Sequence, residues 1–185
     1  AIRHSSAVGA RPTSLSPPLP SSLVWGGRLP LLGAPPPGPC DPSPTLAQNI
    51  PLRGLVLVAT PPGVALSDAS KAMTMFQQMN VPVLGVVENM SYFLGPGCGD
   101  RTEIFGHGGA RAMAEENGVP FLGELPLDPV IRAGGDSGDH VLFTAPESPL
   151  ALAFREMGGR VAARVRVLAM GSGEEEPAVS AGWGG

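Results

Sequence analysis

The sequence predicts an α/β fold in which a parallel sheet is flanked by helices, with disordered segments at both ends. Three observations support this prediction. Short apolar runs alternate with helical segments from residue 54 onward, in the order strand, helix, strand, helix, strand. The run at residues 83–87 is almost wholly apolar, as in a central strand that is covered on both faces. The 185 residues are enough for one domain with a sizeable core.

The first two strands of the predicted sheet bracket an amphipathic helix. Residues 55–59 form the first apolar run, and the Pro- and Gly-containing residues 60–63 form a turn. Residues 82–87 form the second strand, which the polar pair Glu88 and Asn89 closes. Apolar residues recur at helical spacing between the two strands, at Ala65, Ala69, Ala72, Met73 and Phe76.

The remaining elements follow a Gly-rich loop that contains Cys98. Residues 109–117 predict a helix, which Gly118 ends. Residues 121–124 predict a third strand, and residues 149–168 predict a final helix interrupted by Gly158 and Gly159. This alternation is typical of a parallel sheet with right-handed crossovers.

Composition divides the chain into three parts. Residues 1–33 contain Ser, Pro and Arg but no acidic residue and no helical or strand period, so we predict that they are disordered. Residues 34–168 hold the predicted domain, and residues 169–185 form a polar, Gly-rich tail that we also predict to be disordered.

Charge and hydropathy exclude several classes of function. A formal net charge of −4 gives no reason to expect a nucleic acid or an anionic membrane as a partner. The two cysteines, Cys40 and Cys98, do not suggest the disulfide framework of a small secreted domain. No apolar stretch approaches the roughly 20 residues of a membrane helix. We therefore expect a protein that is not secreted and has no membrane span.

Polar residues directly follow the second strand, at Glu88, Asn89 and Ser91. Ligands of open α/β sheets bind beyond the carboxyl ends of the strands. These three residues therefore lie where we expect the chemistry of the protein.

Four segments carry a family resemblance: VENMSYF, CGDRTEIFGHGGAR, GVPFLGELPLDPVIR and GGDSG, in this order. With them, residues 45–165 resemble the Mrp/ApbC family of iron-sulfur cluster carriers, which are P-loop ATPases related to MinD and the nitrogenase iron protein. The resemblance implies the C-terminal part of a P-loop NTPase fold. It also implies a homodimer that binds ATP and magnesium, carries a 4Fe-4S cluster and delivers it to apo iron-sulfur proteins.

The family has a Cys-x-x-Cys pair directly after the SYF segment, and this chain has Gly95 and Cys98 at the two positions. Thiolates are the usual ligands of iron-sulfur clusters, and four are normally needed. The resemblance makes Cys98 the candidate metal ligand. A dimer then offers two sulfurs, unless glutathione, a partner protein or Cys40 completes the set. The alternative is that Cys98 is an ordinary loop cysteine.

The phosphate-binding motifs of the family are missing or altered. No GxxxxGK[ST] sequence occurs, and the single lysine, Lys71, lies in a predicted amphipathic helix. Asp41 matches the last residue of a second phosphate-site element, but Ala34 replaces the family's magnesium-linked aspartate. A proline-rich linker is the alternative interpretation of this segment. Whether the chain is an enzyme stays open.

Adenine recognition is the role that related nucleotide-binding folds imply for Asn89 and for the loop that contains Pro126 and Asp128. A side-chain amide can both donate to and accept from the edge of a base. Asn89 is equally suited to cap the turn that follows the strand. We interpret residues 136–139 as a surface turn, and His107 as a loop or helix-start histidine rather than a zinc ligand, because no further ligands complete a zinc site.

Two functions therefore remain. The first is an iron-sulfur cluster carrier or assembly factor of the Mrp/ApbC type. The second is a truncated, catalytically inactive remnant that acts at most as a partner-binding module, which the missing P-loop and Gly95 favour. We expect a cytoplasmic or organellar location. A mitochondrial one fits the acid-free N-terminal segment and the mitochondrial relatives of the family, although its prolines disfavour a presequence helix.

Overall fold

The structure is a computed structural model of the 185-residue chain, and it describes residues 32–33, 47, 52–95 and 99–171. Residues 47–171 belong to one compact unit, which is the subject of the following paragraphs. Asp41 and Cys98 lie outside the described residues, as do most of the two chain ends that we predict to be disordered.

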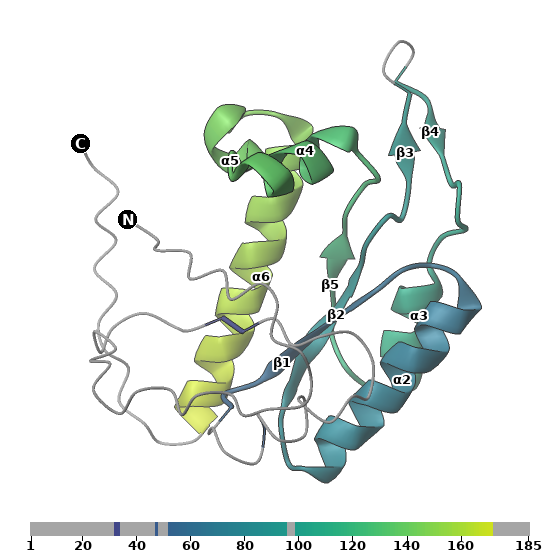
Figure 1. Cartoon of the computed structure of the whole chain (residues 1–185). Coiled ribbons are helices and arrows are strands. Elements are labelled where there is room, and N and C mark those ends of the chain that lie inside the picture. Colours follow the sequence, from purple (N-terminus) through teal and green to yellow (C-terminus); the bar gives the residue numbers. More distant parts are fainter. Residues whose placement is uncertain (1–31, 34–46, 48–51, 96–98, 172–185) are drawn as a thin grey trace, which may run out of the picture. The chain divides into compact units, whose positions relative to one another are not determined.

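Three parallel strands form the main sheet, in the order β1 (Leu55–Ala59), β2 (Val83–Glu88) and β5 (Phe121–Glu124) (Figure 1). Their apolar side chains supply both faces with core contacts, which is why the short apolar runs of the sequence become strands. The predicted α/β class, the parallel sheet and the flanking helices are confirmed.

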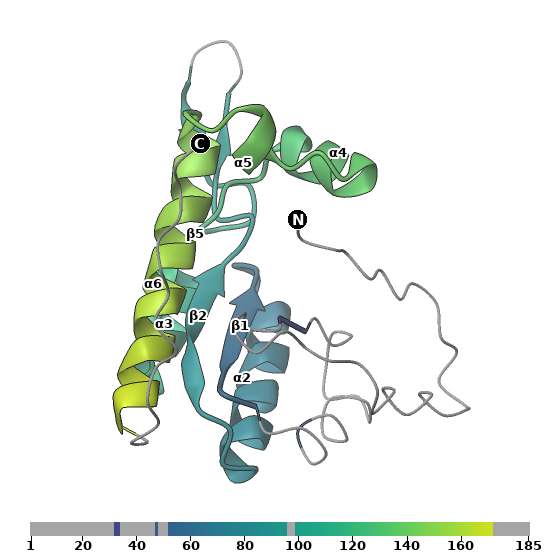
Figure 2. The ribbon, with the colours of Figure 1, turned by 90° about the vertical axis from the view of Figure 1, so that its left-hand side faces the viewer.

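Helices cover the two faces of this sheet (Figure 2). α2 (Gly63–Gln78) and α3 (Gly109–Glu116) pack on one face, where Met73 and Ala114 meet Val86 in the largest buried cluster. α6 (Pro149–Gly171) packs on the other face, where Phe154 and Met157 are among the side chains that cover Val87 and Leu122. The final helix thus runs three residues past its predicted end.

α6 contacts β5 and β2 more than it contacts β1. Val58 of β1 is therefore 60% exposed although it lies in the sheet.

The pairing of β2 with β5 contains a bulge. Val86 lies opposite Phe121 and Val87 lies opposite Gly123, so Leu122 is an extra residue on β5. Gly85 of β2 lies close to this irregularity. A Cβ atom at Gly85 would come within 2.5 Å of the Pro120 carbonyl oxygen, and its φ of +156° also favours glycine.

A hairpin that the sequence did not predict replaces part of the expected cysteine loop. β3 (Phe93–Leu94) and β4 (Arg101–Thr102) pair antiparallel beyond the carboxyl ends of the main sheet (Figure 1). Phe93 also bridges to Leu127, which ties the base of the hairpin to the segment after β5.

Two short helices connect β5 to α6. α4 (Pro129–Ser137) begins with Pro129 and ends at Gly138, whose φ of +83° closes the helix. α5 (Val141–Thr144) follows. Residues 136–139, which we interpreted as a surface turn, include the last residues of α4, and the exposed Asp136 pairs with Arg132 at 2.7 Å. Within the described part of the chain, no helix combines the length and apolar character needed to cross a membrane.

Candidate functional site

The three parallel strands end in register, so that Ala59 pairs with Glu88 and Glu88 pairs with Glu124. The segments that leave β2 and β5 stay adjacent beyond this edge. The Ser91 N–H donates to the Leu125 carbonyl oxygen at 3.0 Å, and the Leu127 N–H donates to the Tyr92 carbonyl oxygen at 2.7 Å. The structure thereby brings the predicted residues Asn89 and Pro126 to neighbouring segments.

Glu88 is fully buried and serves the fold rather than a ligand. Its carboxylate accepts hydrogen bonds from Ser91 Oγ at 2.5 Å, from the Gly108 N–H at 3.0 Å and from the Ala110 N–H at 2.8 Å. The two backbone donors belong to the start of α3, where unpaired N–H groups and the helix dipole favour a carboxylate. Glu88 therefore joins the end of β2 to the start of α3.

The environment of Glu88 keeps it ionised. Burial acts to raise the pKa of this carboxyl, but the hydrogen bonds from Ser91, Gly108 and Ala110 and the nearby His107 outweigh burial, so that the pKa lies below its ordinary value of 4.5. A carboxylate with three donors has little basicity left for proton transfer.

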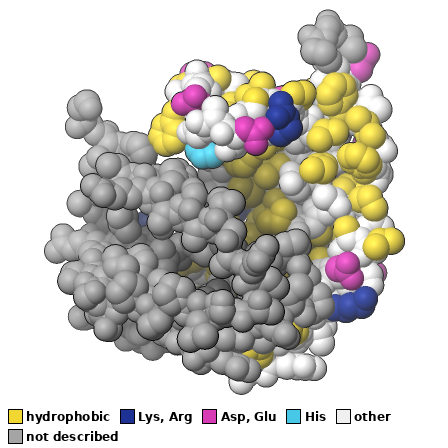
Figure 3. All heavy atoms as spheres, in the orientation of Figure 1, with side chains coloured by type: hydrophobic (Ala, Val, Ile, Leu, Met, Phe, Trp, Pro, Cys, Tyr) yellow, Lys and Arg dark blue, Asp and Glu magenta, His cyan; other side chains and the backbone are white. Residues whose placement is uncertain are grey.

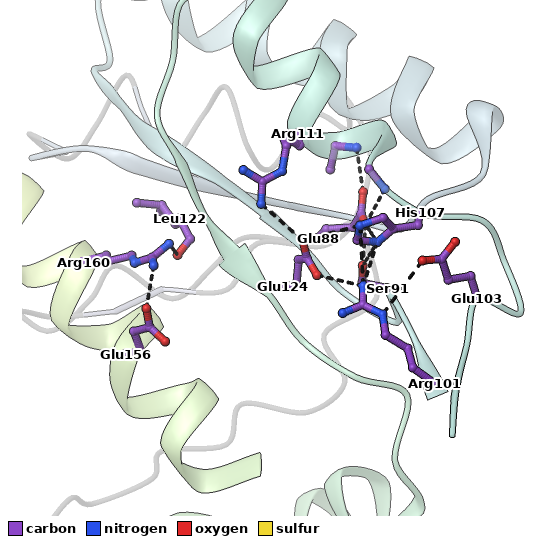
Figure 4. A network of polar contacts seen from close by, with 12 residues as sticks. Glu88, Ser91, Arg101, Glu103, His107, Arg111, Leu122, Glu124, Glu156 and Arg160 are labelled. Carbon is purple, nitrogen blue, oxygen red and sulfur yellow. Dashed lines mark hydrogen bonds and ion pairs between the residues drawn. The ribbon is translucent and has the colours of Figure 1, made fainter. Parts of the chain in front are cut away.

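Ser91 and His107 complete this network (Figure 4). Ser91 is fully buried, so its hydroxyl cannot reach a substrate. Its one proton goes to Glu88, and the hydroxyl oxygen therefore accepts from Nδ1 of His107 at 3.0 Å. Arg101 Nη2 lies over the same ring, 3.1 Å from Nδ1 and 3.5 Å from Nε2. Glu88 and Ser91 lie at the expected edge of the sheet, but both side chains are enclosed.

Asn89 is half-buried and takes part in the turn after β2. Its N–H donates to the Ala59 carbonyl oxygen at 2.8 Å, and its Oδ1 accepts from the Met90 N–H at 3.0 Å. Met90 has a φ of +57°, so this side-chain contact supports an unusual backbone conformation. The Asn89 Nδ2 atom makes no hydrogen bond within the described residues.

Pro126 and Asp128 occupy different environments in the loop after β5. Pro126 is buried between Leu125 and Leu127, whose N–H groups bond to the carbonyl oxygens of Glu88 and Tyr92. Asp128 caps α4, because its Oδ1 accepts from the Val130 N–H at 2.8 Å. Asp128 therefore has a structural partner already.

The residues that flank Cys98 lie at the end of the β3–β4 hairpin. The Gly95 N–H donates to the Asp100 carbonyl oxygen at 3.0 Å, and the Gly99 N–H donates to the Gly95 carbonyl oxygen at 2.8 Å. Residues 96–98 between them lie outside the described residues. Among the residues that the structure does describe, no three His, Cys, Asp or Glu side chains are placed to hold a metal ion.

Sequence reasoning missed a cluster of charges on the outer side of β5. Glu124 accepts from Arg101 Nη2 at 3.2 Å and from Arg111 Nη2 at 3.3 Å (Figure 4). The Arg101 guanidinium lies 4.1 Å from the ring centre of Tyr92, and that of Arg111 lies 4.3 Å from the ring centre of Phe121. Both arginines belong to the CGDRTEIFGHGGAR segment, but no pattern in it shows that they converge on Glu124.

The structure brings two of the predicted site residues together, but the sequence supplies no grip for a phosphate chain. Asn89 Nδ2 and the buried Pro126 lie on adjoining segments at the carboxyl end of the sheet. Phosphates need a cradle of backbone amides and a lysine, yet no GxxxxGK[ST] sequence occurs and Lys71 lies on α2, paired with Asp68 at 3.5 Å. This chain alone therefore offers no phosphate loop that would hold ATP and magnesium.

Comparison with known proteins gives a consistent result. A family model described as ParA: NUBPL iron-transfer P-loop NTPase matches residues 19–162. The iron-sulfur cluster transfer protein NUBPL of Dictyostelium discoideum is 40% identical over 144 residues, which are 78% of this chain and 45% of that protein. The iron-sulfur cluster carrier protein of Synechocystis is 43% identical over 147 residues, 79% of this chain and 42% of that protein.

A plant relative extends this set. The iron-sulfur protein required for NADH dehydrogenase, mitochondrial, of Arabidopsis thaliana is 41% identical over 137 residues, 74% of this chain and 44% of that protein. The chain therefore spans less than half of the length of each of these relatives.

Proposed function

Because this chain belongs to the NUBPL iron-transfer P-loop NTPase family, we propose that it carries an iron-sulfur cluster and delivers it to apo iron-sulfur proteins. The observation that carries the proposal is the β3–β4 hairpin. This hairpin brackets the segment with Cys98, and the family match extends across it.

The base of the hairpin is attached to the sheet at two points. Phe93 of β3 bridges to Leu127, and Arg101 of β4 pairs with Glu124 at 3.2 Å. Such attachments restrict the orientation of the hairpin and therefore reduce the entropy that is lost when its loop binds a cargo. This arrangement supports a loop that presents a ligand.

Cys98 is the cluster ligand in this proposal. A 4Fe-4S cluster takes four thiolates, and soft sulfur ligands match its iron. Two copies of the chain supply two thiolates through Cys98. We propose that a homodimer holds the cluster, with the other sulfurs coming from glutathione or a partner protein.

Exposed apolar side chains near the hairpin support a protein partner. Met90, Leu94, Ile104 and Phe105 are each at least 37% exposed, and Figure 3 shows apolar surface gathered on this side of the described chain. Contiguous apolar surface marks interaction sites on many proteins. We place the dimer contact or the contact with an apo-protein here.

We propose a smaller role for nucleotide than the ATP and magnesium binding that the family resemblance implies. Asn89 and Pro126 offer a place for an adenine, with Asn89 Nδ2 as the donor to the base. Asp128 lies beside this place but its carboxylate caps α4, and Asp41 lies outside the described residues. In this proposal, cluster transfer by this chain alone does not use ATP hydrolysis, because the phosphate-binding sequence is missing.

A partner-binding module without a cluster is the second candidate function. The observation that favours it is Gly95, which removes one thiolate from the position of the family's cysteine pair. For location, we propose the cytoplasm or an organelle, since one relative carries "mitochondrial" in its name and others are bacterial cluster carriers.

Anaerobic reconstitution with iron and sulfide separates the two candidates. A carrier should gain a weak, labile visible chromophore and bound iron. The Cys98→Ser variant should lose both, whereas the Cys40→Ser variant is the matched control and should retain them. Equal iron in the parent and in Cys98→Ser would show adventitious binding and would leave the partner-binding module as the function.

A further inference from the structure

A polar cavity of about 260 Å³ lies along β5, between α3 and α6. It is built at the base of the hairpin and not from residues 95–99, so the proposed cluster site does not account for it. Residues from four elements and from the segment before β3 line it. They include the side chains of Arg101, Arg111, Glu124, Glu156 and Arg160.

Positive charge exceeds negative charge by one in this lining. Arg101, Arg111 and Arg160 contribute three positive charges, and Glu124 and Glu156 contribute two negative charges. Glu124 lies between two of the arginines, and Arg160 Nη2 binds Glu156 at 2.5 Å (Figure 4). Glu103, outside the lining, lies 3.9 Å from Arg101 Nε and offsets this excess, so a ligand would be held by unused N–H groups of an arginine rather than by net charge.

The arginines are oriented by contacts that leave their N–H edges available. Arg101 stacks on Tyr92 and Arg111 stacks on Phe121, so the flat faces of the guanidinium groups are occupied. Each guanidinium has five N–H donors in one plane. Arg111 forms a single ion pair within the described residues, through Nη2 to Glu124 at 3.3 Å. Its remaining N–H groups can donate to a second ligand.

We propose that this cavity binds one carboxylate group of an acidic peptide segment from a partner protein. The planar fork of a guanidinium matches a carboxylate in two parallel hydrogen bonds, whereas Arg111 gives Glu124 only one hydrogen bond, from Nη2. A phosphate dianion would bring a second negative charge close to Glu124 and Glu156 and would be opposed by both. A single carboxylate brings one negative charge only, so it meets less repulsion.

A peptide is a better source of this carboxylate than a small free acid. β5 is the last strand of the sheet within the described residues, so backbone groups of its outer side adjoin the cavity. A peptide can add backbone hydrogen bonds to such an edge while one side chain enters the cavity. Met157 in the lining also suits the aliphatic part of a glutamate.

The test uses the full chain and a peptide labelled at its N-terminus, fluorescein-Gly-Glu-Gly-Glu-Gly-amide, with a Gln-for-Glu peptide of the same length and label as its control. Fluorescence anisotropy should show binding of the Glu peptide that weakens as salt is added, and at least about tenfold weaker binding of the Gln peptide, because charge-assisted hydrogen bonds are lost. Unlabelled succinate should compete poorly.

Variants locate the site. Arg111→Gln should weaken binding at least about tenfold, and Arg111→Lys should give an intermediate loss because it keeps the charge but not the fork. Arg132→Gln is the matched control, since Arg132 lies on α4, is 76% exposed in its side chain and pairs only locally with Asp136. The thermal unfolding midpoint of each variant should stay near that of the parent.

Several results would overturn the proposal. These are equal affinity for the Glu and Gln peptides, no binding by the parent, or equal losses in Arg111→Gln and Arg132→Gln. If succinate binds as tightly as the peptide, the carboxylate does not need to come from a peptide, and that part of the proposal is wrong. If Arg111→Gln does not fold, the Arg111→Lys comparison decides. Cys98→Ser should bind the peptide normally, so failure here is separate from failure of the cluster proposal.

Discussion

Arg160 of α6 donates a hydrogen bond from Nη1 to the carbonyl oxygen of Leu122 at 3.2 Å. Leu122 is the extra residue of the bulge in β5, and a bulge leaves a residue outside the regular ladder of strand pairing. A side chain from the final helix therefore supplies a hydrogen-bond partner within the irregular part of the sheet.

We expect Arg160→Ala to lower the free energy of unfolding by about 1–3 kcal/mol, because the partly buried Leu122 carbonyl oxygen loses its donor. Urea denaturation followed by circular dichroism measures the change. Arg155→Ala is the matched control on the same helix, since within the described residues Arg155 makes only a long surface pair, with Glu147 at 3.8 Å. It should change stability by no more than about 0.5 kcal/mol.

A second control, Glu156→Gln, removes the other partner of Arg160. A loss of unfolding free energy equal to that of Arg160→Ala would contradict the role of the Leu122 carbonyl oxygen.

Glu88 predicts a specific dependence of stability on pH. Its pKa is lower in the folded chain than its ordinary value of 4.5, so the folded state favours the ionised form. This contribution is fully present above the unfolded pKa and is lost as pH falls through the folded pKa. The parent should therefore lose stability between about pH 5 and its acid transition.

Glu88→Gln should remove this part of the pH dependence and lower stability at pH 7 by about 2 kcal/mol or more, because the start of α3 loses a charged acceptor. Denaturation curves at several pH values measure both effects. Asp68→Asn is the matched control, as Asp68 forms one exposed pair with Lys71. An unchanged pH profile in Glu88→Gln would refute the assignment.

Restoring the absent thiolate is the sharpest test of the hairpin as a cluster site. Gly95→Cys should raise the iron content and the lifetime of the chromophore after anaerobic reconstitution, since two sulfurs per chain then complete four across a dimer. Iron assay, visible absorption and size-exclusion chromatography measure the effect. The double variant Gly95→Cys with Cys98→Ser serves as its control and should hold no more iron than the parent. If Gly95→Cys binds no additional iron, the loop is not arranged as a cluster site.

Nucleotide turnover should be undetectable in this chain alone. The missing phosphate loop removes the electrostatic stabilisation that phosphoryl transfer needs. A phosphate-release assay with magnesium and saturating ATP tests this, with Lys71→Ala as the reference because Lys71 lies exposed on α2. Release that exceeds this reference would mean that Lys71 contributes to turnover and would overturn the prediction.

The parallel sheet was predictable because its strands carry their own pattern. The apolar residues of β2 and β5 are local in sequence, and the helices around them show regular spacing or a closing glycine. The β3–β4 hairpin was not predictable, because strands of two residues are too short to show a period.

The site was predicted only in part, for a similar reason. The position of Asn89 after a strand indicated its place at the carboxyl edge of the sheet. The burial of Glu88 depends on the N–H groups of Gly108 and Ala110, which are 20 and 22 residues further along the chain. The convergence of Arg101 and Arg111 on Glu124 depends likewise on pairing between distant segments.

The contact between Glu88 and the start of α3 has a consequence for comparisons among homologues. Its donors are main-chain groups, so the hydrogen bonds set no demand on the side chains at positions 108 and 110. Those positions are limited instead by the φ of +80° at Gly108 and by the complete enclosure of Ala110. An acidic residue that never varies, next to a glycine-rich segment, resembles an active-site acid in an alignment. An invariant acid at position 88 would reflect its structural role in joining β2 to α3. Measurements of stability would therefore explain it better than assays of turnover.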